Sequence, residues 1–124
     1  SSNSQILAIL DELGRGTSTF DGYAIAHSVF RYMVTHLKCR TLFATHYHML
    51  LDDFRNVHNV ASYHMACRQD TKQPDKVKFL YKFSKGECPE SYGMNVALMS
   101  GLDKQIIARA STISTLFKTR MSAL

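Results

Sequence analysis

Residues 6–19 read ILAILDELGRGTST, and this stretch decides how the rest of the chain is interpreted. Five apolar residues come first, then the adjacent carboxylates of Asp11 and Glu12, then a loop rich in glycine and hydroxyl side chains. A short apolar run bounded by turn residues is typical of a strand that is buried on both faces, as in a parallel sheet. Because an uncompensated buried charge is costly, two acids at the end of such a strand indicate a site that uses them.

The composition limits the class of protein. With 124 residues, 45% of them hydrophobic, the chain is long enough for one packed domain. The net charge of +5 is compatible with a nucleic-acid partner, although the lysines are scattered and form no dense basic block. The three cysteines form no C-x-x-C pair, which argues against a disulfide framework and for a reducing compartment (Cys39, Cys67, Cys88). No apolar run reaches the roughly 18 residues of a membrane span, and no secretory signal is present, so we expect a soluble intracellular protein.

The first half of the chain has the order strand, helix, strand. Residues 23–37 place apolar side chains at helical spacing, which predicts a helix packed on a sheet. Residues 41–44 form a second apolar run, so the two strands are predicted to be parallel neighbours in one sheet. A short helix over residues 47–55 follows. Few further strands are found to cover such a sheet, so we expect the chain to be a fragment of a longer one.

In the second half of the chain, the period of the hydrophobic pattern changes to two residues. Residues 61–68 and 77–83 alternate apolar and polar side chains on either side of a polar turn, which predicts an antiparallel pair with one wet face. The lysines at 76, 78 and 82 are expected on that solvated face, and contact with a DNA backbone is the less favoured alternative. Helices are then predicted from Ser91, as N-cap, to Gly101, and from Asp103 to about residue 121. This helix-turn-helix segment is expected to serve packing or dimerisation, because Asp103 would face a DNA phosphate unfavourably.

Parallel strands present their carboxyl ends at the same edge, so Asp11, Glu12 and His46 are expected to gather there. Asp11 is assigned to Mg²⁺ through its water shell, and Glu12 to an attacking water. His46 is assigned to a γ-phosphate as a hydrogen-bond donor. The plainer alternatives are solvated acids and a helix-capping or core histidine. Zinc is the less favoured alternative, because the histidines lack the paired spacing of a structural site (His46, His48, His58, His64).

The loop after the acids offers amides and hydroxyls that could meet phosphate or a second subunit, with a plain flexible loop as the alternative. Its residues are Gly14, Arg15, Gly16, Thr17, Ser18 and Thr19. The chain contains no G-x-x-x-x-G-K-[S/T] cradle to hold the β- and γ-phosphates. These 124 residues therefore carry only part of an ATP site.

These motifs resemble those of one family. Residues 10–22, LDELGRGTSTFDG, resemble the Walker B and D-loop signature of MutS-type mismatch-repair ATPases. Residues 43–48, FATHYH, resemble that family's histidine switch, and residues 91–93, SYG, resemble the opening of its helix-turn-helix. The segments at 64–67, 79–83 and 88–93 are similar to the mismatch-recognising subunit of the eukaryotic MutS-alpha heterodimer. Those at 17–26 and 96–99 are similar to its plant-specific paralogue.

The resemblance implies an α/β fold: the C-terminal half of an ABC-type P-loop NTPase domain over residues 1–88, followed by a helix-turn-helix dimerisation segment over residues 89–124. It implies ATP and Mg²⁺ as cofactors, with Asp11 associated with magnesium, Glu12 hydrolytic and His46 sensing the γ-phosphate. Residues 14–19 would contact the nucleotide site of a second MutS-homologue subunit. The dimer interface would include Ser91, Tyr92, Gly93 and Met94.

The resemblance also implies a nuclear protein that binds mismatched double-stranded DNA, mainly through domains absent here, and that uses ATP to switch to a sliding clamp. No membrane partner is implied. The alternative from another class is a non-catalytic fragment that only binds the partner subunit.

Overall fold

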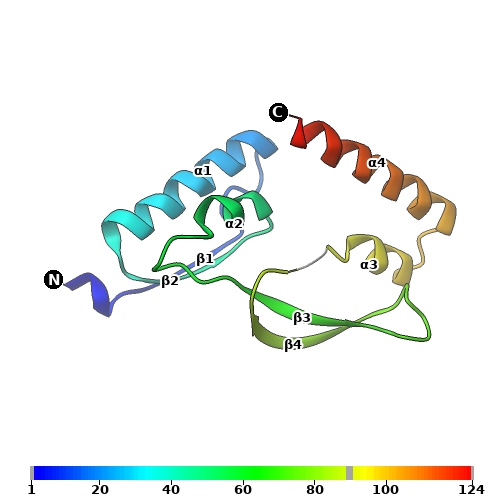
Figure 1. Cartoon of the computed structure of the whole chain (residues 1–124), viewed down its shortest axis with the longest axis horizontal. Coiled ribbons are helices and arrows are strands. Elements are labelled where there is room, and N and C mark those ends of the chain that lie inside the picture. The colour runs from blue at the N-terminus through cyan, green and yellow to red at the C-terminus, as the bar shows by residue number, and fades with distance from the viewer. Residues whose placement is uncertain (1, 89–90, 124) are drawn as a thin grey trace. The chain divides into compact units, whose positions relative to one another are not determined.

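The computed structural model describes residues 2–88 and 91–123 (Figure 1). The chain divides into two compact units, residues 1–62 and 63–124. The domain boundary that the sequence predicts, between residues 88 and 89, falls beside residues 89 and 90, which lie outside the described residues. That boundary therefore stays a prediction.

A parallel strand pair forms the sheet of the first unit. After a short 3₁₀ turn, η1 (Ser2–Gln5), strand β1 (Leu7–Asp11) pairs with β2 (Arg40–Ala44) in register, from Leu7 opposite Arg40 to Asp11 opposite Ala44. The parallel pairing predicted from the strand–helix–strand order is confirmed. The carboxyl ends of both strands consequently lie at one edge of the sheet.

Helix α1 (Thr19–Tyr32) connects the two strands and continues as a π-helical turn, η2 (Met33–Leu37), before Lys38 ends it in the left-handed conformation with φ +51°. The helix begins four residues earlier than predicted. The reason is local, because the Ser18 hydroxyl accepts a hydrogen bond from the backbone amide of Asp21 at 3.3 Å and so caps the first turn.

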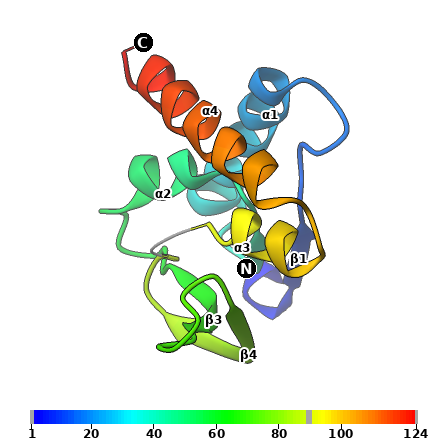
Figure 2. The ribbon, with the colours of Figure 1, turned by 90° about the vertical axis from the view of Figure 1, so that its right-hand side faces the viewer.

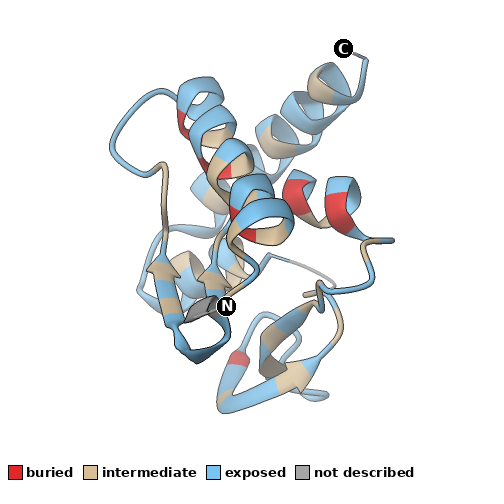
Figure 3. Ribbon diagram, turned by 90° about the vertical axis from the view of Figure 1, so that its left-hand side faces the viewer, coloured by how far each residue is buried: buried red, intermediate tan, exposed pale blue. Residues whose placement is uncertain are grey.

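The core of this unit lies between the two helices and one face of the sheet. Helix α2 (His48–Phe54) is confirmed to within one residue of its predicted bounds. Ala26 of α1 packs against Leu50 and Phe54 of α2, and all three residues are buried. Figure 3 shows buried positions in red on both helices. The Phe30 ring lies 5.0 Å from that of Phe43 on β2 and 4.6 Å from that of Phe54, which joins the helices to the sheet.

The prediction that the first strand is buried on both faces is wrong for this chain. Side chains alternate between exposed and half-buried along β1 and β2, and Ile9 remains 69% exposed. The physical reason is that α1 and α2 both pack on the face that holds Phe43, whereas successive side chains of a strand point to opposite faces. The second face of the described strands is therefore left open.

An antiparallel hairpin opens the second unit, as predicted. Strand β3 (Tyr63–Gln69) pairs with β4 (Val77–Lys85), with Tyr63 opposite Lys85 and Gln69 opposite Val77. A bulge between Met65 and Cys67 interrupts the register, and Tyr81 has φ +53°. The strict alternation expected for β4 is therefore broken: Tyr81 is 85% exposed and Phe83 65% exposed, while Val77 is buried.

Two helices complete the second unit, α3 (Gly93–Met99) and α4 (Lys104–Ser122) (Figure 2). Gly101, with φ +96°, ends α3 as predicted, because its amide bonds to the Leu98 carbonyl and the amide of Leu102 bonds to that of Ala97. Asp103 caps α4 as predicted, accepting from the Gln105 amide at 2.7 Å.

The predicted N-cap of the first of these helices is wrong. Tyr92, not Ser91, is the cap of α3, and the Ser91 hydroxyl instead accepts from the amide of Gly93 at 3.5 Å. Side-chain contacts hold α3 to the hairpin, since Asn95 donates to the carbonyl of Asp75 at 3.2 Å. None of the described helices is long and apolar enough to cross a membrane.

Candidate active site

The predicted acids lie where β1 ends. Asp11 is the last residue of β1, and the Glu12 amide continues the ladder by donating to the Ala44 carbonyl at 2.9 Å. Glu12 itself has φ +55°, a left-handed conformation that costs a non-glycine residue on the order of 1 kcal/mol. This conformation turns the chain sharply, and the amide of Arg15 then bonds back to the Glu12 carbonyl at 3.2 Å.

His46 lies beside Glu12, although 34 residues separate them in the sequence. The imidazole Nδ1 is 3.1 Å from Oε2 of Glu12, and the two side chains are 56% and 37% exposed. A carboxylate only accepts, so Nδ1 carries the hydrogen of this bond. The nitrogen Nε2 can then accept a hydrogen bond, or donate one when the ring is doubly protonated. The pair thus presents a basic oxygen and an ionisable ring at one exposed edge.

Asp11 stands next to this pair with its side chain exposed. A carboxylate oxygen is the kind of ligand that Mg²⁺ takes, and one or two protein carboxylates suffice, because water and substrate phosphates complete the coordination shell. The described residues contain no group of three or more histidine, cysteine and acidic side chains that could hold a metal by themselves. Asp11 therefore fits Mg²⁺ as one carboxylate ligand, with water and substrate phosphates completing the shell.

The glycine loop after Glu12 is built on a close backbone contact. A Cβ on Gly14 would lie 2.2 Å from the Gly22 carbonyl oxygen, and a Cβ on Gly22 would lie 2.2 Å from that of Gly14. Gly14 also has φ +95°. These two positions require glycine because the loop and the first turn of α1 touch there.

The remaining loop residues either form the start of helix α1 or are exposed outside it. Ser18 caps α1 and Thr19 is the first residue of that helix, so both have a structural task. The other three are exposed, and Gly16, with φ +93°, has open space around it (Arg15, Gly16, Thr17). The structure therefore leaves the outer part of the loop free to meet a ligand or another chain.

Tyr47 is a residue that the sequence patterns did not single out. Its hydroxyl donates to the Gly14 carbonyl at 3.1 Å, and its ring lies 4.4 Å from the ring of His46. The only signal in the sequence is that Tyr47 follows His46 directly. The contact with Gly14 depends on folding, because 33 residues separate the two.

A cluster of polar side chains that the sequence did not predict joins α1 to α2. The Tyr23 hydroxyl donates to Asp53, and Nε2 of His27 lies 3.6 Å from the same carboxylate. Partial burial, together with the hydrogen bond to Asp53 and the charge of that carboxylate, raises the pKa of Tyr23 to about 12. This hydroxyl therefore stays protonated and keeps its hydrogen bond throughout the neutral pH range.

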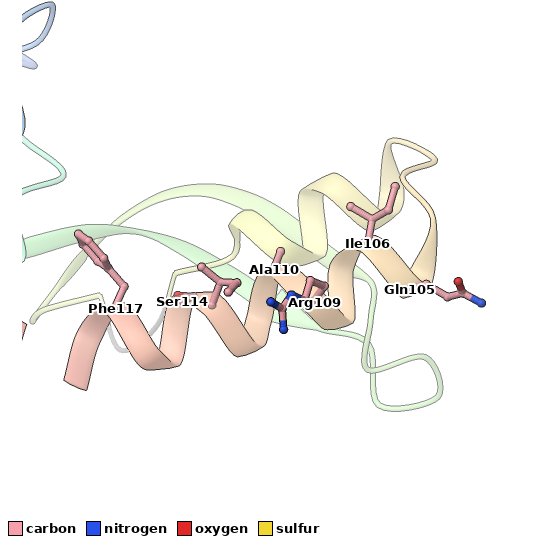
Figure 4. Close-up of a pocket in the computed structure, with 7 residues that line it drawn as sticks. Gln105, Ile106, Arg109, Ala110, Ser114 and Phe117 are labelled. Atoms are coloured by element: carbon pink, nitrogen blue, oxygen red, sulfur yellow. The ribbon is translucent and has the colours of Figure 1, made fainter. Parts of the chain in front are cut away.

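In the second unit, helix α4 carries an open apolar groove. The groove is lined by one face of the helix, and Figure 4 draws the lining residues as sticks: Gln105, Ile106, Arg109, Ala110, Ile113, Ser114 and Phe117. The apolar side chains on this face are largely exposed, with Ile106 at 53% and Phe117 at 61%. At the start of α3, Ser91 and Gly93 are exposed while Tyr92 and Met94 are half-buried.

Comparison with known proteins gives the family. Residues 1–118 match the model of MutS domain V. The chain belongs to the MutS family. This membership confirms the resemblance drawn from the LDELGRGTSTFDG and FATHYH motifs.

Individual proteins of the MutS family are also similar to this chain in sequence. The DNA mismatch repair protein MSH7 of Arabidopsis thaliana is 54% identical over 112 residues, which is 85% of this chain and 10% of the relative. Human Msh6 is 47% identical over 107 residues, 83% of this chain and 8% of the relative. MutS of a Roseiflexus species is 48% identical over 109 residues, 86% of this chain and 10% of the relative. This MutS domain V chain thus spans about a tenth of the length of these relatives.

Proposed function

We propose that this chain is the part of a mismatch-repair ATPase that acts on the attacking water and on the γ-phosphate of ATP. Glu12 is the base that orients the water, His46 contacts the γ-phosphate, and Asp11 holds Mg²⁺ through its water shell. The observation that carries the proposal is the 3.1 Å contact between Glu12 and His46 at the shared end of two parallel strands. Ligands of open α/β sheets bind at such edges.

The residues of the chain suit these roles chemically. The carboxylate of Glu12 can accept a hydrogen bond from water, and positioned acid–base groups typically accelerate a reaction by roughly 10²–10⁴-fold. When doubly protonated, the His46 ring can donate from Nε2 to a phosphate oxygen as charge develops there. When bound, Mg²⁺ would neutralise charge on the phosphate oxygens. The backbone bond from Glu12 to Ala44 keeps the two strand ends together while this happens.

The intact protein is proposed to work as a nuclear heterodimer with a second MutS-homologue subunit. Residues 14–19 would face the nucleotide site of that subunit, and the exposed outer part of the loop supports this role. Residues 89–124 would contribute to dimerisation, a role that the exposed apolar stripe of α4 supports. The printed names of the relatives support a function in DNA mismatch repair.

ATP binding and hydrolysis would then switch the dimer on mismatched DNA between searching and sliding-clamp states. The 124-residue chain contains no phosphate-binding G-x-x-x-x-G-K-[S/T] motif. We therefore expect hydrolysis from the longer protein and none from this chain alone.

The test is the Glu12→Gln substitution in the longer protein, assembled with its partner. We expect turnover at the site that Glu12 serves to fall by about 100-fold or more, because the amide cannot act as a base. Nucleotide affinity should change little, since the substitution preserves the shape of the side chain. Glu87→Gln is the matched control: Glu87 is an exposed acid after β4 and should leave turnover unchanged.

The alternative function is that of an interaction module that only binds a partner subunit. The exposed apolar groove of α4 favours this reading. The same experiment separates the two functions. Unchanged hydrolysis in Glu12→Gln would remove the catalytic role and leave partner binding as the function of this segment.

A further inference from the structure

We propose that Tyr47 is a positioning residue that holds His46 and the glycine loop, residues 14–18, together as one unit. The proposal rests on the proposed ATPase function, because it concerns the geometry of that site. Tyr47 itself need not contact the nucleotide. It would act through the Gly14 carbonyl on one side and through its neighbour His46 on the other.

The contacts of Tyr47 converge from two directions. Its hydroxyl donates to the carbonyl of Gly14 at 3.1 Å, and its backbone amide donates to the Thr45 hydroxyl at 3.0 Å. The ring packs edge-on against Tyr23, with 5.8 Å between centroids, and lies 4.4 Å from the ring of His46. The side chain is thus held at the base and along the ring, while its hydroxyl is directed at the loop.

Glycine at position 22 makes this contact possible. A Cβ there would lie 2.4 Å from the Tyr47 hydroxyl oxygen as well as 2.2 Å from the Gly14 carbonyl oxygen. Gly22 also donates its backbone amide to the Ser18 carbonyl at 2.8 Å in the first turn of α1. The Tyr47 hydroxyl therefore lies where the start of the loop meets the helix that follows it.

The start of the loop is consequently held by groups that belong to the candidate site. Just before the loop, Glu12 bonds to Ala44 through the backbone and to His46 through the side chain. At the first residue of the loop, the Gly14 carbonyl accepts from the Tyr47 hydroxyl. Because Tyr47 follows His46 directly, a movement of His46 on binding a phosphate would move the hydroxyl that holds the loop. The arrangement couples the histidine to the loop without any contact between their own side chains.

The experiment compares Tyr47→Phe with Tyr23→Phe in the longer protein assembled with its partner. Each substitution removes one hydroxyl from the same aromatic cluster, but only that of Tyr47 bonds to the loop. Hydrogen exchange at the amides of residues 14–18 is measured without nucleotide, and kcat and KM for ATP are measured separately. Losing one hydrogen bond predicts about three- to tenfold faster loop exchange and a similar fall in kcat for Tyr47→Phe. For Tyr23→Phe, loop exchange and kcat should stay within about twofold of the parent values. The KM for ATP should stay within the same limit in both variants.

Gly22→Ala disturbs the same junction, since its added methyl group would press on both the Tyr47 hydroxyl and the Gly14 carbonyl. It should also speed loop exchange. Loop exchange that is unchanged in Tyr47→Phe, or equally raised in Tyr23→Phe, would overturn the proposal. A Tyr47→Phe enzyme with normal kcat would do the same. Glu12→Gln is measured in parallel to distinguish failure of the proposed ATPase function from failure of the Tyr47 proposal. If Glu12→Gln does not slow hydrolysis, the ATPase role is refuted, and the exchange data still test the role of Tyr47.

Discussion

At the scale of single residues, Gly14 and Gly16 show how glycines with similar positive φ angles can serve different purposes. Their φ angles are +95° and +93°, so each occupies the left-handed region that glycine adopts freely. Gly14 lies against the backbone of Gly22, whereas nothing lies within 4 Å of a Cβ built on Gly16. Of the two glycines in the GRG sequence, Gly14 is therefore required by close packing, whereas Gly16 lies in an open turn.

This difference leads to a prediction for the pair of alanine variants. Gly16→Ala should cost about 1 kcal/mol of local stability, from the left-handed backbone alone. Gly14→Ala should cost about 3 kcal/mol, because the clash with Gly22 adds to the same strain. Hydrogen exchange at the amides of residues 12–22 in the longer protein measures both values. Equal costs for the two variants would contradict the close contact.

At the scale of elements, helix ends follow from local sequence where a side chain reaches its own backbone. Ser18 and Asp103 cap α1 and α4 through hydrogen bonds to amides two or three residues ahead. Ser91 has a suitable side chain but does not cap α3, because the helix begins at Gly93. A good capping residue thus marks a helix start only when the backbone enters the helix at that point.

The cap of α4 can be tested apart from the rest of the fold, because it is local. In a synthetic peptide of residues 101–123, Asp103→Ala should destabilise the helix by about 1 kcal/mol and lower the helical circular dichroism signal at 222 nm. Asp103→Asn is the control, since its side-chain oxygen still accepts from the Gln105 amide. Equal signals from the alanine and asparagine peptides would show that the cap contributes nothing.

At the scale of the whole molecule, the described residues bury few apolar side chains. The buried hydrophobic residues are Ala26, Met33, Leu50, Phe54 and Val77. By contrast, many large apolar side chains of the sheets and of α4 remain exposed, among them Ile9 and Phe117 at 69% and 61%. Hydrophobic burial is the main favourable term in folding, so a chain with so small a core has little net stability.

We therefore expect the isolated 124-residue chain to be poorly stable. It should bind a hydrophobic dye such as ANS and unfold over a broad temperature range, because its exposed apolar faces have no cover within the units described. Calorimetry and dye fluorescence on the pure chain measure this. A sharp cooperative transition without dye binding would contradict the expectation.

Much of the fold could be predicted because its signals are local. The parallel pair, the antiparallel hairpin and all four α-helices follow from hydrophobic period and turn residues, with errors of up to four residues at the ends. The expectation that Glu12 and His46 would gather also followed, from the rule that parallel strands share an edge. The bulge between Met65 and Cys67 was not predicted, because the alternation of apolar and polar residues in β3 gives no sign of it.

The sequence by itself determined the family, the order of the elements and the chemical groups at the strand ends. Only the tertiary structure decided that α1 and α2 cover one face of the sheet, and that the Tyr47 hydroxyl meets Gly14 beside Gly22. The physical reason is the range of the interactions. Period, caps and turns depend on neighbours within a few residues, whereas the contact between Tyr47 and Gly14 joins residues 33 apart and exists only once helix and strands have packed.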